Sequence, residues 1–168
     1  AEGLGFQCLC DLYEKVIPAG RSLIREYYPR FEAGEVPRTP QNENQATWWP
    51  KRRPNHGLID WNQSAEDVYN WIRGQSEPYP GAFSYINGEK VVILGANPPS
   101  GERVFAPPGT VLEKKDDRLV VAVWEEALEI TEIRVTNEER KPAAALLELS
   151  GIEINSRFEN ARDLQQRR

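Results

Sequence analysis

Methionine is absent from the 168 residues, histidine occurs once, and cysteine occurs twice. Because translation starts with methionine, the chain is expected to be a processed product or a fragment; loss of the initiator from a methionine-poor protein is the alternative. No apolar run reaches the length of about eighteen residues that spans a bilayer, so no membrane partner is expected. Hydrophobic residues make up 39% and charged residues 28%, which excludes a disordered chain and allows one average domain, or a small domain with an appendage.

The two cysteines, Cys8 and Cys10, form a C-x-C pattern, and the single histidine, His56, lies far from them. A structural zinc site takes four ligands, so no metal site is expected. Two reduced thiols are the simpler interpretation, and reduced thiols are typical of cytoplasmic proteins. We therefore expect a cytoplasmic protein.

Apolar residues recur at helical spacing from residue 6 to residue 31, which predicts a long helix with one apolar stripe. Pro18 lies inside the pattern and is expected to kink the helix or break it in two. Since most of the remaining chain has the pattern of a small β domain, the helix is expected to pack on a partner outside the chain. The stripe contains Leu9, Leu12, Val16, Ala19, Leu23 and Tyr27.

Residues 33–57 are predicted to be an extended linker, because prolines punctuate them throughout. Trp48 and Trp49 are too apolar to be left in water, so the linker is expected to lie against a domain. A second helix is predicted to follow, with Ser64 and Asp67 as its capping box and Gly74 at its end. Its buried face is expected to contain Val68, Trp71 and Ile72.

Residues 82–135 change to period two and to β-branched residues, which is typical of strands. Asn87-Gly88 joins two strands by the preferred two-residue turn, and the KKDD sequence at 114–117 is the turn of a second hairpin. ALEITEIRV is a fifth strand, in which the apolar alternation slips before Ile133. Five or six short strands predict a small antiparallel barrel rather than a sandwich.

Beyond the strands, Pro142 is expected to start a short helix that Gly151 ends. The charged residues after it, from Asn155 to the end of the chain, are expected to form a frayed helix. The fold class is therefore mostly β with helices.

Three motifs occur in a specific order: PQ-x-E-x-x-AT, then IDW, then IRG followed by PGAF. Together with APPGTVLE and LEITEIRV, they resemble the C-terminal part of 10-formyltetrahydrofolate-dependent formyltransferases, such as methionyl-tRNA formyltransferase and UDP-4-amino-4-deoxy-L-arabinose formyltransferase. The resemblance covers roughly residues 12–154. GLIDW and EPYPGAF are most similar to the aminosugar enzymes.

The resemblance implies a division of the chain into parts. Residues 1–32 would be the last helix of a missing Rossmann-like N-terminal catalytic domain, and residues 33–57 the interdomain linker. Residues 58–157 would form an antiparallel barrel that resembles the OB fold, and residues 158–168 a tail.

In this family, an upstream Asn, His and Asp perform the chemistry, and neither of the loops that carry the His and the Asp is present here. His56 stands in a Pro-rich linker without a matching motif, so no catalytic residue is assigned. The chain alone is expected to be inactive and to bind no cofactor, whereas the intact enzyme would use 10-formyltetrahydrofolate.

Lys51, Arg52 and Arg53 are the candidates for binding an anionic substrate such as a nucleotide sugar, because Arg suits phosphate geometry; a solvated linker is the alternative. Asp60 and Trp61 form a domain-junction motif. Asp60 either orients a substrate group or accepts backbone N–H groups before the coming helix, and Trp61 fills the junction.

Phe83 and Tyr85 lie on one face of the first strand. They are either a stacking platform, as in barrels that bind single strands, or core aromatics, which is the commoner case.

The charge of −5 is unevenly distributed, because residues 58–135 alone carry seven Lys/Arg and thirteen Asp/Glu. This acidic stretch disfavours tRNA, since binding a polyanion requires basic residues. The favoured acceptor is a small amine such as an aminosugar nucleotide. The other class of function is a freestanding, non-enzymatic OB-like binding or interaction module.

Overall fold

The computed structural model describes residues 9–35, 38–135, 139–149 and 151–160. The chain divides into two compact units, Ala1–Arg53 and Pro54–Arg168. Across the described ranges, no helix combines the length and the apolar character that crossing a membrane requires. Cys8 is outside the described residues, and so is the side chain of Cys10, so their predicted reduced state stays a prediction.

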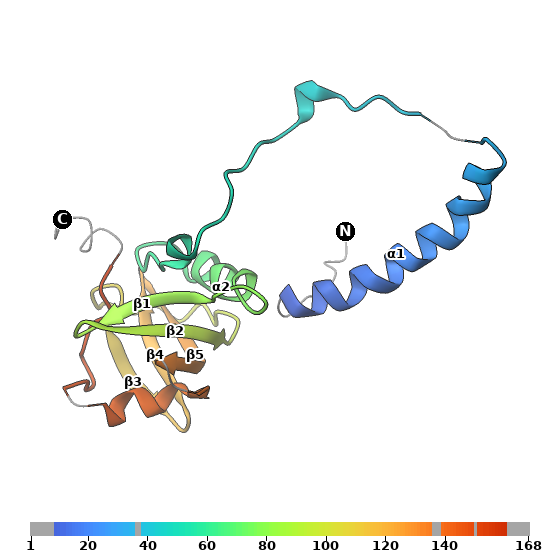
Figure 1. The fold of residues 1–168 in the computed structure, drawn as a ribbon. Coiled ribbons are helices and arrows are strands. Elements are labelled where there is room, and N and C mark those ends of the chain that lie inside the picture. The colour runs from blue at the N-terminus through green and yellow to red at the C-terminus, as the bar shows by residue number, and fades with distance from the viewer. Residues whose placement is uncertain (1–8, 36–37, 136–138, 150, 161–168) are drawn as a thin grey trace. The chain divides into compact units, whose positions relative to one another are not determined.

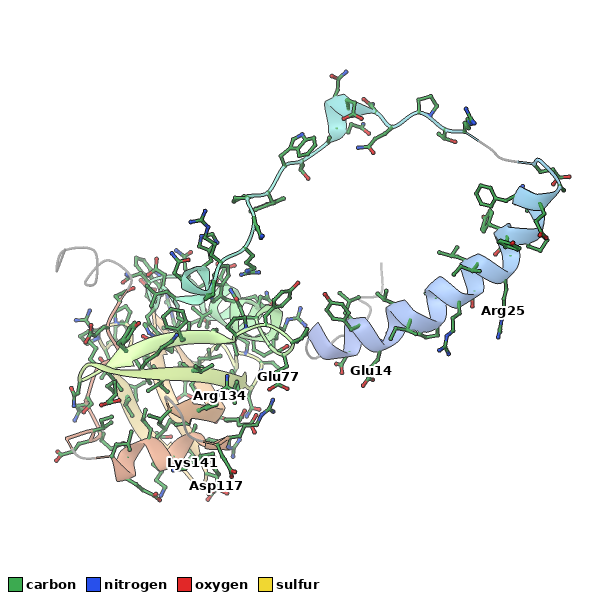
Figure 2. The ribbon with its side chains drawn as sticks, viewed as in Figure 1. Glu14, Arg25, Glu77, Asp117, Arg134 and Lys141 are labelled. Carbon is green, nitrogen blue, oxygen red and sulfur yellow. The ribbon has the colours of Figure 1, made fainter. Side chains whose placement is uncertain are left out.

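The first unit consists of one long helix, α1 (Leu9–Glu32), and an extended segment (Figure 1). Of the two expectations at Pro18, the break is wrong, because the helix runs through both Pro18 and Pro29; the kink stays a prediction. A proline removes one intrahelical hydrogen bond, and the remaining bonds of a 24-residue helix hold the two sides together. The expected amphipathic pattern is present: Glu14 and Arg25 project from one side of the helix (Figure 2).

The apolar side chains of α1 are largely exposed within this unit. We call this set the apolar face of α1. It consists of Leu12, Tyr13, Val16, Ile17, Leu23, Ile24, Tyr28 and Phe31.

The linker after α1 contains one short 3₁₀ helix, η1 (Glu43–Gln45), which Asn42 caps by accepting the N–H of Asn44 at 3.1 Å. Within the first unit Trp48 and Trp49 are 88% and 87% exposed, and the expectation that they lie against a domain stays a prediction.

The second unit starts with a 3₁₀ helix, η2 (Pro54–Gly57), followed by the helix α2 (Ala65–Gly74). The predicted cap of α2 is confirmed: Ser64 Oγ accepts the N–H of Asp67 at 3.1 Å and donates to the Asp67 carboxylate at 2.7 Å. Val68 and Ile72 are buried as predicted, whereas Trp71 is half-exposed. Trp71 lies at the edge of the buried face of this short helix.

The sheet of this unit is antiparallel, with the strand order β1-β2-β5-β4-β3 (Figure 1). This confirms a mostly β fold with a few helices; its likeness to the OB fold stays a prediction. The strands are β1 (Ala82–Ile86), β2 (Glu89–Ala96), β3 (Val111–Lys115), β4 (Arg118–Val123), β5 (Glu126–Val135) and the two-residue β6 (Lys141–Pro142), which pairs with β5.

The hairpin turns follow from local sequence. Asn87 and Gly88 both have positive φ, of 50° and 82°, as the predicted two-residue turn requires. In the second hairpin the turn is shorter than predicted: Lys114 and Lys115 belong to β3, and Asp116 takes the positive φ of 52°. Aspartate tolerates this conformation better than lysine does, which explains the shift.

The predicted slip in the fifth strand is confirmed as an irregularity of pairing between β2 and β5. Ile133 pairs with Ile93 and Ile130 pairs with Ala96, and the register shifts on both sides of Gly95. The two shifts cancel, because three positions separate these pairs on each strand, and the local irregularity allows Ile130 and Ile133 both to be buried although they are three positions apart.

The short helix after the strands is a 3₁₀ helix, η3 (Ala143–Glu148), with Pro142 at its N-cap as predicted. It ends earlier than predicted, because its C-cap is Leu149 rather than a residue next to Gly151. Its buried side chains Ala143 and Leu146 belong to the hydrophobic core.

The end of the described chain closes the sheet. Phe158 donates its N–H to Gly109 at 2.9 Å beside β3, and Glu159 donates its N–H to Tyr85 of β1 at 2.7 Å. Residues 155–160 therefore join the two edge strands. The frayed helix predicted for this segment is wrong over these residues, because they are extended; the rest lies outside the described residues.

Trp61 occupies the centre of the core and is 0% exposed. Its ring stacks on Phe158 at 5.2 Å between centroids, and its indole N–H donates to Ser84 Oγ at 3.1 Å. Gly109 packs so closely beside this pair that an added Cβ would lie 2.7 Å from the Phe158 carbonyl oxygen and 3.4 Å from the Trp61 ring.

This packing predicts that Gly109→Ala destabilises the fold more than Gly101→Ala. Both glycines have positive φ, so each substitution costs about 1–2 kcal/mol in backbone conformation. Only at position 109 would the new methyl group contact backbone atoms, and this overpacking adds about 1–3 kcal/mol to the destabilisation. At position 101 no atom lies within 4 Å of the new methyl group. Urea unfolding of both variants measures the difference, and equal losses would contradict the proposed closeness of Phe158.

Candidate functional site

The three basic residues expected to bind an anion, Lys51, Arg52 and Arg53, all have exposed side chains at the end of the first unit. Their role in substrate binding stays a prediction.

Asp60 makes the structural contacts that were expected as its alternative role. Its Oδ1 accepts the backbone N–H and the side-chain N–H of Asn62, both at 3.1 Å, and its Oδ2 accepts from Gln63 at 3.3 Å. The carboxylate therefore shapes the turn that leads into α2. Trp61 lies inside the second unit, in its core, and its role at a junction with another domain stays a prediction.

Phe83 and Tyr85 contact each other edge to face at 5.8 Å, and the Lys90 ammonium lies 3.9 Å from the centre of the Phe83 ring. Phe83 is only 6% exposed, since η2 covers it: an added Cβ on Gly57 would touch the ring. A buried ring cannot stack on a base, so the platform interpretation is wrong for Phe83. The ring belongs to a second layer of packing outside the central core cluster.

A cleft of about 240 Å³ lies over β4 and β5, beside the loop that leaves β2. Val120 and Ala127 form its apolar floor, and both are buried. Neither belongs to the central core cluster, so the cleft is on the outer face of the sheet. The other lining residues are Asn97, Pro98, Ser100, Glu102, Lys115 and Glu129.

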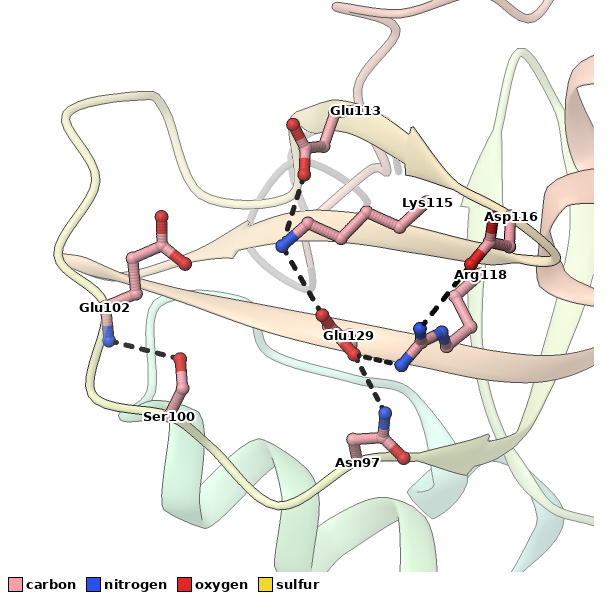
Figure 3. Close-up of polar contacts among 8 residues, drawn as sticks. All are labelled: Asn97, Ser100, Glu102, Glu113, Lys115, Asp116, Arg118 and Glu129. Atoms are coloured by element: carbon pink, nitrogen blue, oxygen red, sulfur yellow. Dashed lines mark hydrogen bonds and ion pairs between the residues drawn. The ribbon is translucent and has the colours of Figure 1, made fainter.

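Glu129 is the centre of the polar contacts in this cleft (Figure 3). Its Oε2 accepts from Asn97 and from Arg118, both at 2.8 Å. Its Oε1 lies 3.5 Å from the Lys115 ammonium, which also pairs with Glu113 at 3.2 Å. One carboxylate therefore ties the β2–β3 loop to β3 and β4.

These contacts shift the ionisation of the groups involved. The hydrogen bond from Asn97 lowers the pKa of Glu129, partial burial opposes it, and the charges of Arg118 and Lys115 add to the lowering. The hydrogen bond to Glu113 raises the pKa of Lys115, with further raising from Glu129. Both groups are consequently charged at neutral pH.

The sequence analysis did not identify this cleft. Its residues come from four segments, and a polar residue on an outward-facing strand position has the ordinary pattern of a solvated face. The charged positions of β3, β4 and β5 were visible, but their meeting at one point depends on the strand order.

A second ion cluster connects the loop after α2 with the start of β6. Arg140 pairs with Glu77 at 2.5 Å and with Glu132 at 3.5 Å. The hydrogen bond from Arg140 lowers the pKa of Glu77, with a smaller contribution from Arg134. Figure 2 labels Glu77, Arg134 and Lys141 in this region, which is exposed and therefore suits a stabilising contact more than a binding site.

Residues 51–150 match the family described as formyl transferase, C-terminal domain. The chain belongs to this family. The matched range begins at Lys51 and contains the strands, both ion clusters and the cleft of this formyl transferase C-terminal domain.

Solved structures of HypX from Aquifex aeolicus are similar to the chain. One variant matches with a TM-score of 0.65 and 26% identity over 90% of this chain and 28% of that one. Another, with a TM-score of 0.57 and 29% identity, covers 78% and 23%. HypX in complex with tetrahydrofolic acid matches with a TM-score of 0.56 and 28% identity over the same shares. The chain spans about a quarter of the length of these HypX chains.

The lowered pKa of Glu129 predicts how Glu129→Gln changes the stability of this formyl transferase C-terminal domain. Because the folded pKa lies below the unfolded value, the charged group stabilises the fold at neutral pH, by about 1 kcal/mol for such a partly exposed pair. That contribution is lost as the pH falls through the folded pKa. The stability gap between wild type and variant should therefore close on acidification.

Unfolding midpoints in urea at several pH values between neutral and acidic test this expectation. The matched control is Glu89→Gln, which removes an exposed carboxylate at the start of β2 that does not line the cleft. A gap that is constant with pH, or equal to that of the control, would argue against the ion cluster as a source of stability.

Proposed function

We propose that this chain is the non-catalytic C-terminal region of a formyltransferase that transfers formyl from 10-formyltetrahydrofolate to an amine acceptor. The observation that carries the proposal is the family membership of residues 51–150. The HypX complex with tetrahydrofolic acid supports a folate for the intact enzyme, and none is assigned to this chain. The chain contributes domain packing and contacts on the acceptor side, and alone it is inactive.

The apolar face of α1 supports the second part of the proposal, a missing N-terminal catalytic domain. Eight large apolar side chains on one helix are exposed in the first unit. Since burying each of them contributes about 1.5–3 kcal/mol, a free surface of this kind needs a cover. A Rossmann-like domain of which α1 is the last helix provides that cover. The proposed location of the protein is the cytoplasm.

The experiment that tests this part is sequencing the DNA upstream of the codon for Ala1. We expect an in-frame domain with the Asn, His and Asp that activate the amine and stabilise the tetrahedral intermediate. If the reading frame opens at Ala1 without such a domain, the enzyme-part interpretation is overturned.

The net charge of residues 58–135 bears on the nature of the acceptor. Residues 58–135 carry a net charge of −6, from seven Lys/Arg and thirteen Asp/Glu, so the barrel repels a polyanion such as tRNA. A nucleotide aminosugar has few phosphates, and Lys51, Arg52 and Arg53 suffice to bind them. Arg pairs with a phosphate through two parallel hydrogen bonds, which gives orientation as well as affinity.

Replacing Lys51, Arg52 and Arg53 together by Ala should raise the KM of the intact enzyme for the aminosugar nucleotide about tenfold, because hydrogen bonds to charged groups contribute about 1.5–3 kcal/mol. The kcat should change less. The control replaces three other cations, Lys114, Arg134 and Lys141, which alters the charge equally. Steady-state kinetics measure both variants.

If methionyl-tRNA is the acceptor instead, the triple variant should weaken tRNA binding and flatten its salt dependence. Absence of tRNA binding, together with formylation of the aminosugar nucleotide, supports the proposed acceptor. Equal KM values for the triple variant and its control would contradict the assignment of the three residues.

One observation favours a second candidate, a freestanding OB-like binding or interaction module. The unit from Pro54 onward has its own core, and its edge strands are joined by residues 155–160. Ligand binding by residues 54–168 expressed alone discriminates between the two: both interpretations allow this unit to fold, but only the second requires it to bind a biological ligand without the upstream domain.

A further inference from the structure

The loop between β2 and β3 is fixed at both ends of the cleft on the outer face of the sheet. Asn97 donates its backbone N–H to the Glu129 carbonyl at 2.8 Å, and the Glu102 carbonyl accepts the N–H of Ala127 at 3.0 Å. Arg103 then forms an isolated backbone β-bridge with Glu126. The backbone of the loop is therefore held against β5 before any ligand arrives, and the side chains of Ser100 and Glu102 are exposed on it.

Glu102 differs from the other carboxylates of the cleft. Glu129 and Glu113 are paired with cations, whereas the described contacts of Glu102 are made by its backbone: its N–H donates to Ser100 Oγ at 3.3 Å, and its carbonyl accepts from Ala127. Figure 3 shows the Glu102 side chain extending from the loop with no interaction drawn to its carboxylate. The cleft thus contains one carboxylate that is available to a ligand.

The charges of the residues that line the cleft favour a cationic ligand. Among its lining residues, Glu102 and Glu129 carry negative charge and only Lys115 is positive. The Lys115 ammonium is already shared between Glu113 and Glu129, whose charges offset its own. An anionic ligand would meet two carboxylates, and a cationic one would neutralise Glu102.

We propose that this cleft binds a primary ammonium group carried on a short aliphatic chain. The ammonium donates to the Glu102 carboxylate and to the remaining lone pair of Ser100 Oγ, and its methylene groups lie on the floor formed by Val120 and Ala127. This inference goes beyond the proposed function, since it concerns equilibrium binding by this chain and does not depend on formyl transfer.

A metal ion is a poorer match for the same site. Calcium takes six to eight oxygen ligands, and magnesium demands octahedral geometry. Within the described part of the chain, no three His, Cys, Asp or Glu side chains are grouped so that they hold a metal. One carboxylate, one hydroxyl and an apolar floor instead suit an organic cation.

The experiment is isothermal titration of the full chain with n-butylammonium, and with n-butanol and butanoate as neutral and anionic probes of the same length. We expect saturable binding of n-butylammonium and none of butanoate. Glu102→Gln should weaken the binding about fivefold, which corresponds to about 1 kcal/mol for an exposed ion pair. Ser100→Ala should weaken it less. Glu89→Gln is the control and should leave the affinity unchanged.

A short neutral peptide with one internal lysine distinguishes the two sources of such a group, a small amine and a lysine side chain of another protein. Tighter binding of the peptide than of n-butylammonium assigns the cleft to a protein lysine, and the reverse assigns it to a small amine; both support the proposal. Binding of neither, equal binding of n-butanol, or the same affinity for Glu102→Gln and wild type would overturn it. Urea midpoints confirm that each variant is folded.

Discussion

The indole of Trp61 connects three segments that lie far apart in the sequence. The indole N–H donates to Ser84 in β1, and the indole ring stacks on Phe158. The backbone carbonyl oxygen of Trp61 accepts the N–H of Trp124 at the tip of the β4–β5 hairpin. Ser84 in turn donates to the carbonyl of Glu159 at 2.9 Å. A buried indole or hydroxyl without a partner is costly, so the two groups fix each other, and the closing segment is held by the same contacts.

The two faces of the sheet differ in the side chains that they carry. The inner face packs on Trp61, α2 and η3 and is almost wholly apolar. The outer face of β4 and β5 keeps a buried apolar layer at Val120 and Ala127 but surrounds it with charged side chains that are anchored to Glu129. The inner face therefore supplies most of the buried apolar surface, and the outer face adds the smaller contribution of the Glu129 contacts.

Much of the fold is determined by local signals. The turn at Asn87-Gly88, the Ser64 cap and the slip before Ile133 are each specified within a few residues, and all three are found as predicted. The failures concern tertiary context. Trp71 and Phe158 have the same apolar character, yet one is half-exposed and the other buried. Their burial depends on which segment closes the sheet, which no local pattern records.

The candidate site shows the same limit more strongly. The contacts of Asp60 were predictable, because an aspartate two residues before an N–H donor forms a local turn. The meeting of Asn97, Lys115 and Glu129 was not, since it requires the strand order β5-β4-β3. Lys51, Arg52 and Arg53 are candidates because arginine suits phosphate geometry, and their role stays a prediction.

Closure of the sheet by residues 155–160 has a consequence for biosynthesis. A ribosome makes β1 and β3 well before the segment that joins them, so the nascent domain exposes two unpaired strand edges until residue 159 has emerged. During that interval the edges are open to pairing with other chains, as in any folding intermediate with free strands. Completion of residues 155–160 therefore removes strand edges that the finished structure no longer exposes.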